Sequence, residues 1–326
     1  MKSSIDFKHT SFLILVKDEE FFSKKLVNHI NSQNIKAEII IADGSKRKQK
    51  KIFDKLNIKK KYFYFGEDKN IQKFFLKTFK GVKKCSKKFI FFCDQDDFVN
   101  FQSIKRHEIF LLKNKDYAAV QGIIYNFSYV NDKIKLLGKQ YNLYKNFKSF
   151  LLRHLFNSHF RSYYALRRKN DLIKIYNIIN KFKLHDFRSA EFINDLITLS
   201  SNQVKSDENE VSVLRWAGVK KRDGNNHIIS QIHNNRFQWF NFFFSKEKKL
   251  IKTLLNKENM FFKNFYIFKL YIFLTDILVN IIKKSYFSRM FNKIFMDEYA
   301  NLSEKHFKKL NINLIIKQKN IFNKNY

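Results

Sequence analysis

Three aspartates stand within four residues, directly after a strongly apolar segment of this 326-residue chain. Asp94, Asp96 and Asp97 follow the run KFIFFC, and carboxylates packed so closely repel one another unless a cation compensates their charge. Hard oxygen ligands in a row suit Mg²⁺ or Mn²⁺, and these ions in turn bind diphosphate oxygens. The pattern indicates a metal–diphosphate site. The alternative interpretation is a solvated turn in which Asp97 caps the next helix.

Two other apolar segments also end in polar residues. Ser11–Val16 runs into Lys17 and Asp18, and Ala37–Ala42 runs into Asp43 within the turn sequence DGS. Ligands of an open parallel sheet lie beyond the carboxyl ends of its strands. We therefore expect these residues to line the same site as the three aspartates.

The first 130 residues alternate apolar runs with helix-like stretches. Strands are predicted at residues 11–16, 37–42, 61–65, 88–93 and 116–127, and helices at residues 19–33, 71–82 and 103–113. Strands separated by helix-length crossovers imply βαβ units and a mostly parallel sheet. Beyond about residue 145 the chain is expected to be mainly helical until a loop at residues 200–210. We predict an α/β domain over residues 1–230 and a helical, aromatic-rich and basic region over residues 231–326.

The segments VKDEEFF, IIIADGS, FFCDQDDFV and DYAAVQG resemble glycosyltransferase family 2 in their order and separations, over roughly residues 10–225. The resemblance implies a GT-A fold, in which a Rossmann-like, mostly parallel sheet is flanked by helices. It implies transfer of a sugar from a nucleotide diphosphate sugar to a glycan or lipid-linked acceptor, with inversion and with Mg²⁺ or Mn²⁺ as cofactor. The similarity is strongest to a bacterial subgroup found with surface-polysaccharide genes, which implies a role in polysaccharide synthesis.

The same resemblance suggests roles for the acidic residues. It places Asp43 against the nucleotide base, and it places Asp96 and Asp97 against the ribose and the metal–diphosphate. Asp97 is preferred as the metal ligand because the triplet DDF matches the family's ending. Asp94 is a second candidate ligand, since Asp94, Gln95 and Asp96 also form a DXD triplet.

The first loop departs from the family pattern. Family members usually begin with a Pro-Thr-x-Asn-Arg type of loop, whereas this chain contains no proline and has Lys17 and Asp18 there. Asp18 takes the place of the asparagine, and its extra negative charge near a diphosphate is unfavourable unless Lys17 offsets it. A sugar nucleotidyltransferase on a related fold is the alternative enzyme, but it requires a Gly- and Arg-rich phosphate loop that VKDEEFF lacks.

An inverting transfer needs a carboxylate that accepts the proton of the acceptor hydroxyl. In the family this base comes from the start of a helix well after the DXD motif. Glu191 matches that glutamate best, and Asp195, one helical turn further on, is the second candidate. The alternative is that Glu191 only complements the helix dipole in the first turn.

Four basic residues are candidate contacts for an anionic acceptor or a phosphate. Arg167 and Arg168 are adjacent and suit bidentate binding, with a solvated helix face as the alternative. Arg215 lies in VLRW, which resembles the Arg-Trp pair of processive family members, although Ser212 replaces their glutamine. His227 follows a flexible turn and is a candidate for a metal or diphosphate contact, or else a plain surface histidine.

The chain is strongly basic, with a net charge of +35. Lys and Arg outnumber Asp and Glu by 46 to 23 in residues 1–230 and by 18 to 6 in residues 231–326, which we interpret as an even spread. Such a charge favours anionic membrane surfaces and nucleotide phosphates. No zinc-finger or RNA-recognition signature supports nucleic acid, so none is expected as a partner. A non-catalytic, basic membrane- or polyanion-binding protein is the alternative from another class.

The expected location is the cytoplasm, peripherally on the inner face of the cell membrane. Two cysteines are too few for a disulfide framework, and the N-terminus shows no signal-peptide pattern. Residues 261–284 predict a helix with a wide apolar face and a narrow polar stripe. Such a helix lies in a bilayer interface or packs on the catalytic domain, and the sequence leaves both open.

Overall fold

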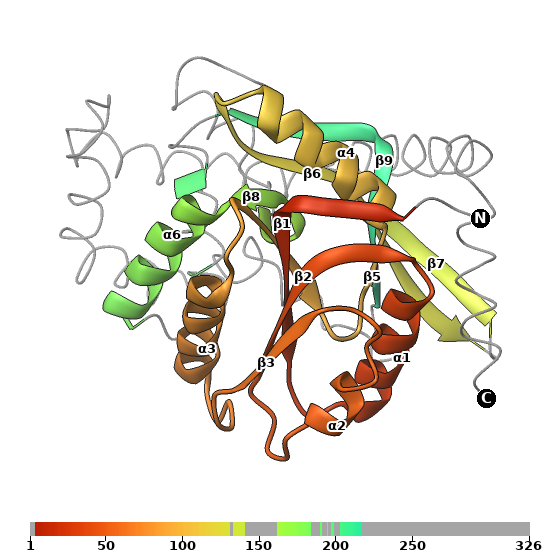
Figure 1. The fold of residues 1–326 in the computed structure, drawn as a ribbon, viewed down its shortest axis with the longest axis vertical. Helices are drawn as coiled ribbons and strands as arrows, with labels where there is room; N and C mark the ends of the chain where they lie inside the picture. The colour runs from red at the N-terminus through yellow and green to blue at the C-terminus, as the bar shows by residue number, and fades with distance from the viewer. Residues whose placement is uncertain are drawn as a thin grey trace, which may run out of the picture. The chain divides into compact units, whose positions relative to one another are not determined.

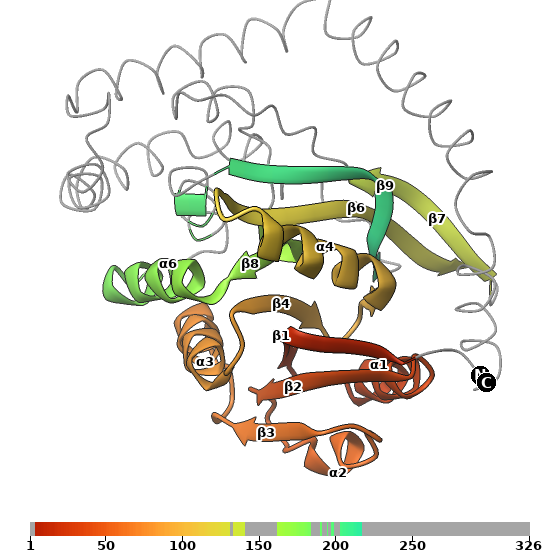
Figure 2. The same ribbon diagram turned by 45° about the horizontal axis from the view of Figure 1, so that its top comes forward.

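A computed structural model describes residues 4–130, 133–140, 162–183, 190, 194, 197–198 and 203–216 of the chain. Within that part, nine strands form one sheet in the order β3-β2-β1-β4-β8-β6-β9-β5, with β7 paired to β6. Figure 2 shows these strands following one another across the molecule. The predicted domain boundary after residue 230 and the predicted helix at residues 261–284 lie outside the described residues.

Strands and helices alternate along the chain (Figure 1). The first part contains β1 (Ile5–Val16), α1 (Glu20–Asn31), β2 (Ile35–Asp43), α2 (Lys50–Phe53), β3 (Lys60–Tyr64), α3 (Ile71–Lys84) and β4 (Phe89–Asp94). The second part contains β5 (Phe98–Val99), α4 (Phe101–Lys113), β6 (Tyr117–Val130), β7 (Lys133–Gln140), the short 3₁₀ helix η1 (Ser162–Tyr164), β8 (Leu166–Arg168), α6 (Lys169–Lys181) and β9 (Gln203–Trp216). The five strands and three helices predicted for the first 130 residues are all present.

The predicted α/β fold is confirmed, and its parallel character is clearest in the first half of the sheet. β3, β2, β1 and β4 are mutually parallel, as their helical crossovers require. β8 runs antiparallel to both β4 and β6, while β6 and β9 are parallel to each other. β5 and β7 also pair antiparallel with their neighbours. The sheet is therefore mixed beyond β4.

The loop predicted at residues 200–210 is wrong for most of its length, because β9 begins at Gln203. Its polar residues pair with β6 up to Asp207, and the ladder resumes at Val211 after a bulge. Gly122 of β6 faces this bulge, where a Cβ atom would lie 2.5 Å from the carbonyl oxygen of Glu210. The stability of this strand comes from its ladder with β6, which polarity along the sequence does not reveal.

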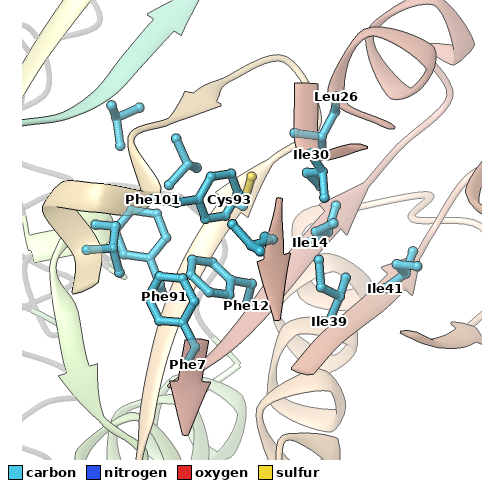
Figure 3. Packing of buried hydrophobic residues seen from close by; sticks show 14 of the residues in the cluster. Phe7, Phe12, Ile14, Leu26, Ile30, Ile39, Ile41, Phe91, Cys93 and Phe101 are labelled. Carbon is cyan, nitrogen blue, oxygen red and sulfur yellow. The ribbon is translucent and has the colours of Figure 1, made fainter. Parts of the chain in front are cut away.

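One face of the sheet carries the largest apolar cluster. Phe12 and Ile14 of β1, Ile39 and Ile41 of β2 and Phe91 of β4 alternate with residues of the opposite face, as a pleated strand requires. They pack beneath α1, α2 and α4, and Figure 3 shows several of these side chains in contact. This packing fixes the relative heights of the three strands, so that their carboxyl ends meet at one edge.

The other face of the sheet is covered by α3 and α6. Gly81 allows α3 to approach closely, because a Cβ there would lie 2.9 Å from Cδ1 of Leu13 and 3.3 Å from Cβ of Ala42. Phe92 of β4 packs edge-on against Tyr176 of α6 at 5.8 Å between ring centroids. No helix in the described part of the chain is long and apolar enough to cross a membrane.

Candidate functional site

The loops that follow β1, β2 and β4 are tied together by short polar contacts. Gln95 accepts a hydrogen bond from the backbone amide of Lys17 (2.8 Å) and donates one to its carbonyl (2.7 Å). The amide of Asp18 donates to Oγ of Ser45 (2.8 Å), and the Asp18 carboxylate accepts from the amide of Lys46 (2.7 Å). These contacts hold the three loops in one arrangement before any ligand binds.

Asp43, at the end of β2, is fully buried. Its carboxylate accepts hydrogen bonds from the amides of Ser45 (2.8 Å) and Gln49 (2.9 Å) and from the hydroxyl of Tyr62. The aspartate thereby shapes the turn after β2 and the start of α2. Its predicted contact with a nucleotide base stays a prediction.

A buried ion pair lies beside this turn. Lys77 of α3 approaches Asp68 at 2.5 Å, and both side chains are almost completely buried. The Lys77 ammonium also donates to the carbonyl of Val16 (2.8 Å). Gly44 leaves the room for Asp68, because a Cβ there would lie 2.2 Å from its carboxylate. Burial lowers the pKa of Lys77 and raises that of Asp68, and their mutual attraction opposes both shifts.

The three aspartates at the end of β4 and in the turn after it converge. Asp94, Asp96 and Asp97 each place a carboxylate oxygen within 4.8 Å of the others. Asp97 is buried, whereas Asp94 and Asp96 are half-buried. The side chain that caps α4 is that of Asn100, whose oxygen accepts from the amide of Ser103 (3.3 Å). The alternative interpretation of Asp97 as the helix cap is therefore wrong.

Tyrosine hydroxyls fix two of the three carboxylates. Tyr163 donates to Oδ1 of Asp94 (2.7 Å). Tyr164 donates to Oδ2 of Asp97 and lies 3.3 Å from Oδ2 of Asp94. The second oxygen of Asp97 accepts from the backbone amide of Trp216 (3.3 Å). Within the described part of the chain, the Asp96 carboxylate has only its own backbone amide as a hydrogen-bond donor.

Burial makes the charged form of these carboxylates unfavourable. It raises the pKa of Asp94, raises that of Asp96 to about 6, and with the two neighbouring aspartates raises that of Asp97 well above its usual range. Arg215 of β9 opposes these shifts in all three. Its guanidinium lies 5.8 Å from the ring centroid of Tyr164. Burial opposes the charge of Arg215, but Tyr164 and the aspartates raise its pKa overall.

The donor set suits a divalent cation. Three carboxylates are brought together in partly or fully buried positions, and a single nearby guanidinium does not neutralise them all. Their oxygens are the hard ligands that Mg²⁺ and Mn²⁺ prefer. The residues present therefore fit the ion that the sequence predicted.

The structure corrects the predictions for Arg167 and Arg168. Arg168 pairs with Phe89 at the start of β4, at the opposite end of that strand from Asp94. Its guanidinium donates to the carbonyls of Tyr117 (2.8 Å), Asn114 (3.0 Å) and Leu111 (3.2 Å), and so closes the end of α4.

Arg167 is also committed within the protein. It is 1% exposed, contacts Ser162 and Asn194, and faces the ring of Phe92 at 5.5 Å. Arg215 is the arginine whose charge acts on all three aspartates. The predicted residues Glu191, Asp195 and His227 lie outside the described residues, although Asn194 between the two acids is helical and buried.

Sequence reasoning missed Gln95, Tyr163 and Tyr164 as parts of this site. For Gln95, the sequence offers one indication of a role in the site, which is its position between Asp94 and Asp96. The two tyrosines are 67 to 70 residues from the carboxylates that they contact, and the pairing of β8 with β4 brings them there. Periodicity along the sequence carries no information about such a pairing.

A comparison with curated proteins finds no match. Among solved structures, the fold resembles that of TarS from S. aureus. The structure of TarS 1-349 in complex with UDP-GlcNAc matches with a TM-score of 0.46 and 14% identity, over 68% of this chain and 62% of that chain. A second crystal structure of S. aureus TarS matches with a TM-score of 0.44 and 13% identity, over 73% of this chain and 44% of that one. The chain thus spans less than two thirds of the length of either.

The family comparison covers the part of the chain that builds the site. The sequence profile described as "Glycosyl transferase family 2" matches residues 11–181, just over half of the chain. The matched region runs from the buried part of β1 to the end of α6, and it includes Asp43 and the aspartates after β4. It excludes the alternative of a sugar nucleotidyltransferase. The chain belongs to glycosyl transferase family 2.

Proposed function

We propose that this family 2 glycosyltransferase moves a sugar from a nucleotide diphosphate sugar to a glycan or lipid-linked acceptor, with a divalent metal and with inversion at the anomeric carbon. The observation that carries the proposal is the cluster of Asp94, Asp96 and Asp97 beside Arg215, at the carboxyl edge of the sheet. A diphosphate and its cation are the ligands whose combined charges suit this mixture of acidic and basic groups.

The three aspartates would hold Mg²⁺ or Mn²⁺, and the ion, when bound, would neutralise the charge of the diphosphate leaving group. Tyr164 and the amide of Trp216 keep the Asp97 carboxylate in a fixed direction. The Asp96 carboxylate is the least committed to protein partners and is therefore the most available to a ligand. Because the tyrosines are already in place, little reorganisation accompanies binding.

Arg215 supplies a fixed positive charge on the same side of the site. Its guanidinium lies over the Tyr164 ring and interacts with all three aspartates. A guanidinium remains protonated in such surroundings and binds phosphate oxygens through paired donors. We assign it to the diphosphate of the donor.

The loops after β1 and β2 would hold the nucleoside. Asp43 shapes the turn of residues 44–49, and Asp18 ties that turn to the end of β1. Lys17 precedes Asp18 in the chain, and its backbone amide and carbonyl both hydrogen-bond to the side chain of Gln95, which stands between the aspartates. This connection couples the nucleoside end of the donor site to its diphosphate end.

The proposed catalytic base is Glu191, with Asp195 as the second candidate. Asn194, adjacent to Asp195 in the sequence, is held by Arg167 and by Ser162, whose Oγ accepts from its amide nitrogen at 2.6 Å. Turnover of Glu191→Gln and Asp195→Asn, each compared with donor binding, distinguishes the two candidates.

The proposed biological setting is bacterial surface polysaccharide synthesis on the inner face of the membrane. Its support is the order of the family motifs and the basic character of the chain. A screen of nucleotide diphosphates by thermal shift, with and without Mn²⁺, tests the donor class first. A rise in melting temperature that needs both nucleotide and metal supports the proposal, and the absence of such a rise for any nucleotide contradicts it.

A further inference from the structure

Within residues 4–130, the positive charge is concentrated in one segment. Residues 46–88 contain 17 Lys and Arg but only 3 Asp and Glu. The flanking segments are nearly balanced, with 5 basic and 6 acidic residues in 4–45 and with 4 and 5 in 89–130. The even spread expected from the sequence therefore does not hold in this part of the chain.

This segment forms the β3 edge of the sheet and the helices that flank it, α2 on one face and α3 on the other. We call the surface of α2, β3, α3 and the loops between them the basic face. β3 is the edge strand of the sheet, and Figures 1 and 2 show α2 and α3 beside it. Most of its basic side chains are exposed. Three of them, Lys50, Lys61 and Lys77, form ion pairs with acidic residues in the described part of the chain. Lys60 donates to the backbone carbonyls of Asp54 and Leu56, and most of the other basic side chains are exposed.

Aromatic rings lie directly beneath several of these lysines. The ammonium of Lys83 is 4.1 Å from the ring centroid of Phe79, and that of Lys84 is 5.1 Å from the ring of Phe63. Lys80 lies 5.9 Å from the half-buried ring of Phe65. A charged group above a partly exposed ring suits a boundary that is anionic on its outside and apolar beneath.

The position of this charge shows that it does not serve the donor site alone. Lys59–Lys61 stand at the start of β3, and Lys83–Lys88 stand between the end of α3 and the start of β4. Both groups are therefore at the amino-terminal edge of the sheet, opposite the aspartates that follow β4. A nucleotide at the carboxyl edge does not reach them.

The basic side chains of this surface suit a partner without fixed geometry. All 17 basic residues of the segment are lysines except Arg47. Lysine is a flexible point charge, whereas arginine is preferred where individual phosphates are bound in a defined orientation. A layer of lipid headgroups is such a diffuse anionic partner.

We propose that the basic face docks the enzyme on an anionic phospholipid surface. The proposal assigns membrane contact to the catalytic domain itself, independently of residues 261–284 and of the identity of the donor. Exposed lysines meet the headgroup phosphates, and Phe63, Phe65 and Phe79 lie against the boundary beneath them. The active-site edge remains free for donor and acceptor, because the lysines at the opposite edge share the contact.

The test is partition of the full-length protein onto vesicles of phosphatidylglycerol and phosphatidylcholine in equal parts, at low salt. Neutralising Lys80, Lys83 and Lys84 together by substitution with Gln should lower the partition coefficient by roughly 100-fold, since each lysine near such a surface contributes about fivefold. The matched control neutralises Lys8, Lys113 and Lys115, which are equally exposed but lie outside the basic face. The partition coefficient of the control variant should fall much less.

Nucleotide binding and the melting temperature should be unchanged in both triple variants, which shows that they are folded. Residues 231–326 are present in every protein, so any contribution from them is common to all. Equal losses in the two triple variants would overturn the proposal, as would equal binding of the wild type to vesicles of phosphatidylcholine alone. Binding to an RNA oligonucleotide through the same three lysines, without vesicle binding, would also overturn it.

Discussion

Buried carboxylates occur in two kinds of surroundings in this protein. Glu108 of α4 is fully buried, yet it accepts from the Thr10 hydroxyl (2.7 Å) and the His9 amide (3.1 Å) and has Lys105 at 2.5 Å. Asp68 likewise has Lys77. The cluster of Asp94, Asp96 and Asp97 forms no ion pair with a basic side chain among the described residues; Arg215 acts on all three aspartates from a distance, and Lys77 acts on Asp94.

We interpret the difference as one between carboxylates that hold the fold together and carboxylates that bind a ligand, as proposed for the three aspartates. Each structural carboxylate brings a cation from a neighbouring element, so its burial is compensated in the folded protein. The site aspartates are held in place by neutral groups, namely two tyrosine hydroxyls and a backbone amide, and these fix direction without cancelling charge. Removing a charge should therefore have opposite effects on stability in the two regions.

The largest effect is expected at the structural ion pair. Lys77→Met leaves Asp68 buried without a cation and should lower the free energy of unfolding by about 3–5 kcal/mol. Urea denaturation measures the change. Adding Asp68→Asn to that variant should restore much of the loss, since no buried charge then remains. A double variant as unstable as the single one would show that packing, rather than charge, sets the cost.

At the aspartate cluster, removing a charge is expected to increase the free energy of unfolding instead of lowering it. Asp96→Asn removes one of three mutually repelling carboxylates and should raise the metal-free stability at neutral pH by about 1–2 kcal/mol, in line with the raised pKa of that residue. The same urea experiment in the presence of EDTA tests it. A loss of stability in this variant would mean that Asp96 has a structural role, and the comparison between the two regions would fail.

The pH dependence of the metal-free protein sharpens the same comparison. Burial raises the folded-state pKa of Asp96 to about 6, above an ordinary value of 3.8. Its contribution to stability is therefore fully present below about pH 4 and is lost as the pH rises through 6. In EDTA, the melting temperature should therefore fall between about pH 4 and pH 6 because of Asp96. This part of the fall should be absent in Asp96→Asn and should be offset by Mn²⁺. If the melting temperature of the wild type followed pH in parallel with that of the variant, the expected role of Asp96 would be contradicted.

The smallest effect concerns the tyrosines. Tyr164→Phe removes the hydroxyl that joins Asp94 and Asp97 and should weaken Mn²⁺ binding several-fold, which corresponds to about 1 kcal/mol. Tyr163→Phe, which loses a contact to Asp94 alone, serves as the matched control and should weaken binding less. Calorimetric titration of the metal in the presence of a nucleotide diphosphate gives both values. Equal effects would argue against a joining role of Tyr164.

Much of the parallel half of the fold could be predicted, because its signals are local. Apolar runs such as Ser11–Val16 and the periodicity of residues 71–82 mark strands and helices directly, and the polar residues that follow the strands mark the ligand edge. The part of the sheet beyond β4, which mixes parallel and antiparallel pairs, was harder to predict from the sequence. β9 is polar along much of its length, and its pairing with β6 is what makes it a strand.

The same reason limited the prediction of the site. Asp43 and the three aspartates could be singled out as candidates because they lie at the ends of strands, and Arg215 through its motif; the structure brings the three aspartates together and places Arg215 where its charge acts on them. Arg168 looked equivalent to Arg215 in the sequence, and only the pairing of β8 with β4 shows that it points its guanidinium to the end of α4. Tertiary pairing, which is not encoded in local spacing, decides which arginine serves the site.

The most direct test of the central claim is calorimetric titration of a nucleotide diphosphate into wild type and Asp97→Asn, with and without Mn²⁺. The carboxylate of Asp97 is fixed by Tyr164 and by the amide of Trp216 beside two further aspartates. The account predicts Mn²⁺-dependent binding by the wild type and its loss in the variant, with an unchanged circular dichroism spectrum. Metal-dependent binding of equal affinity in Asp97→Asn would contradict the assignment of this cluster as the metal–diphosphate site.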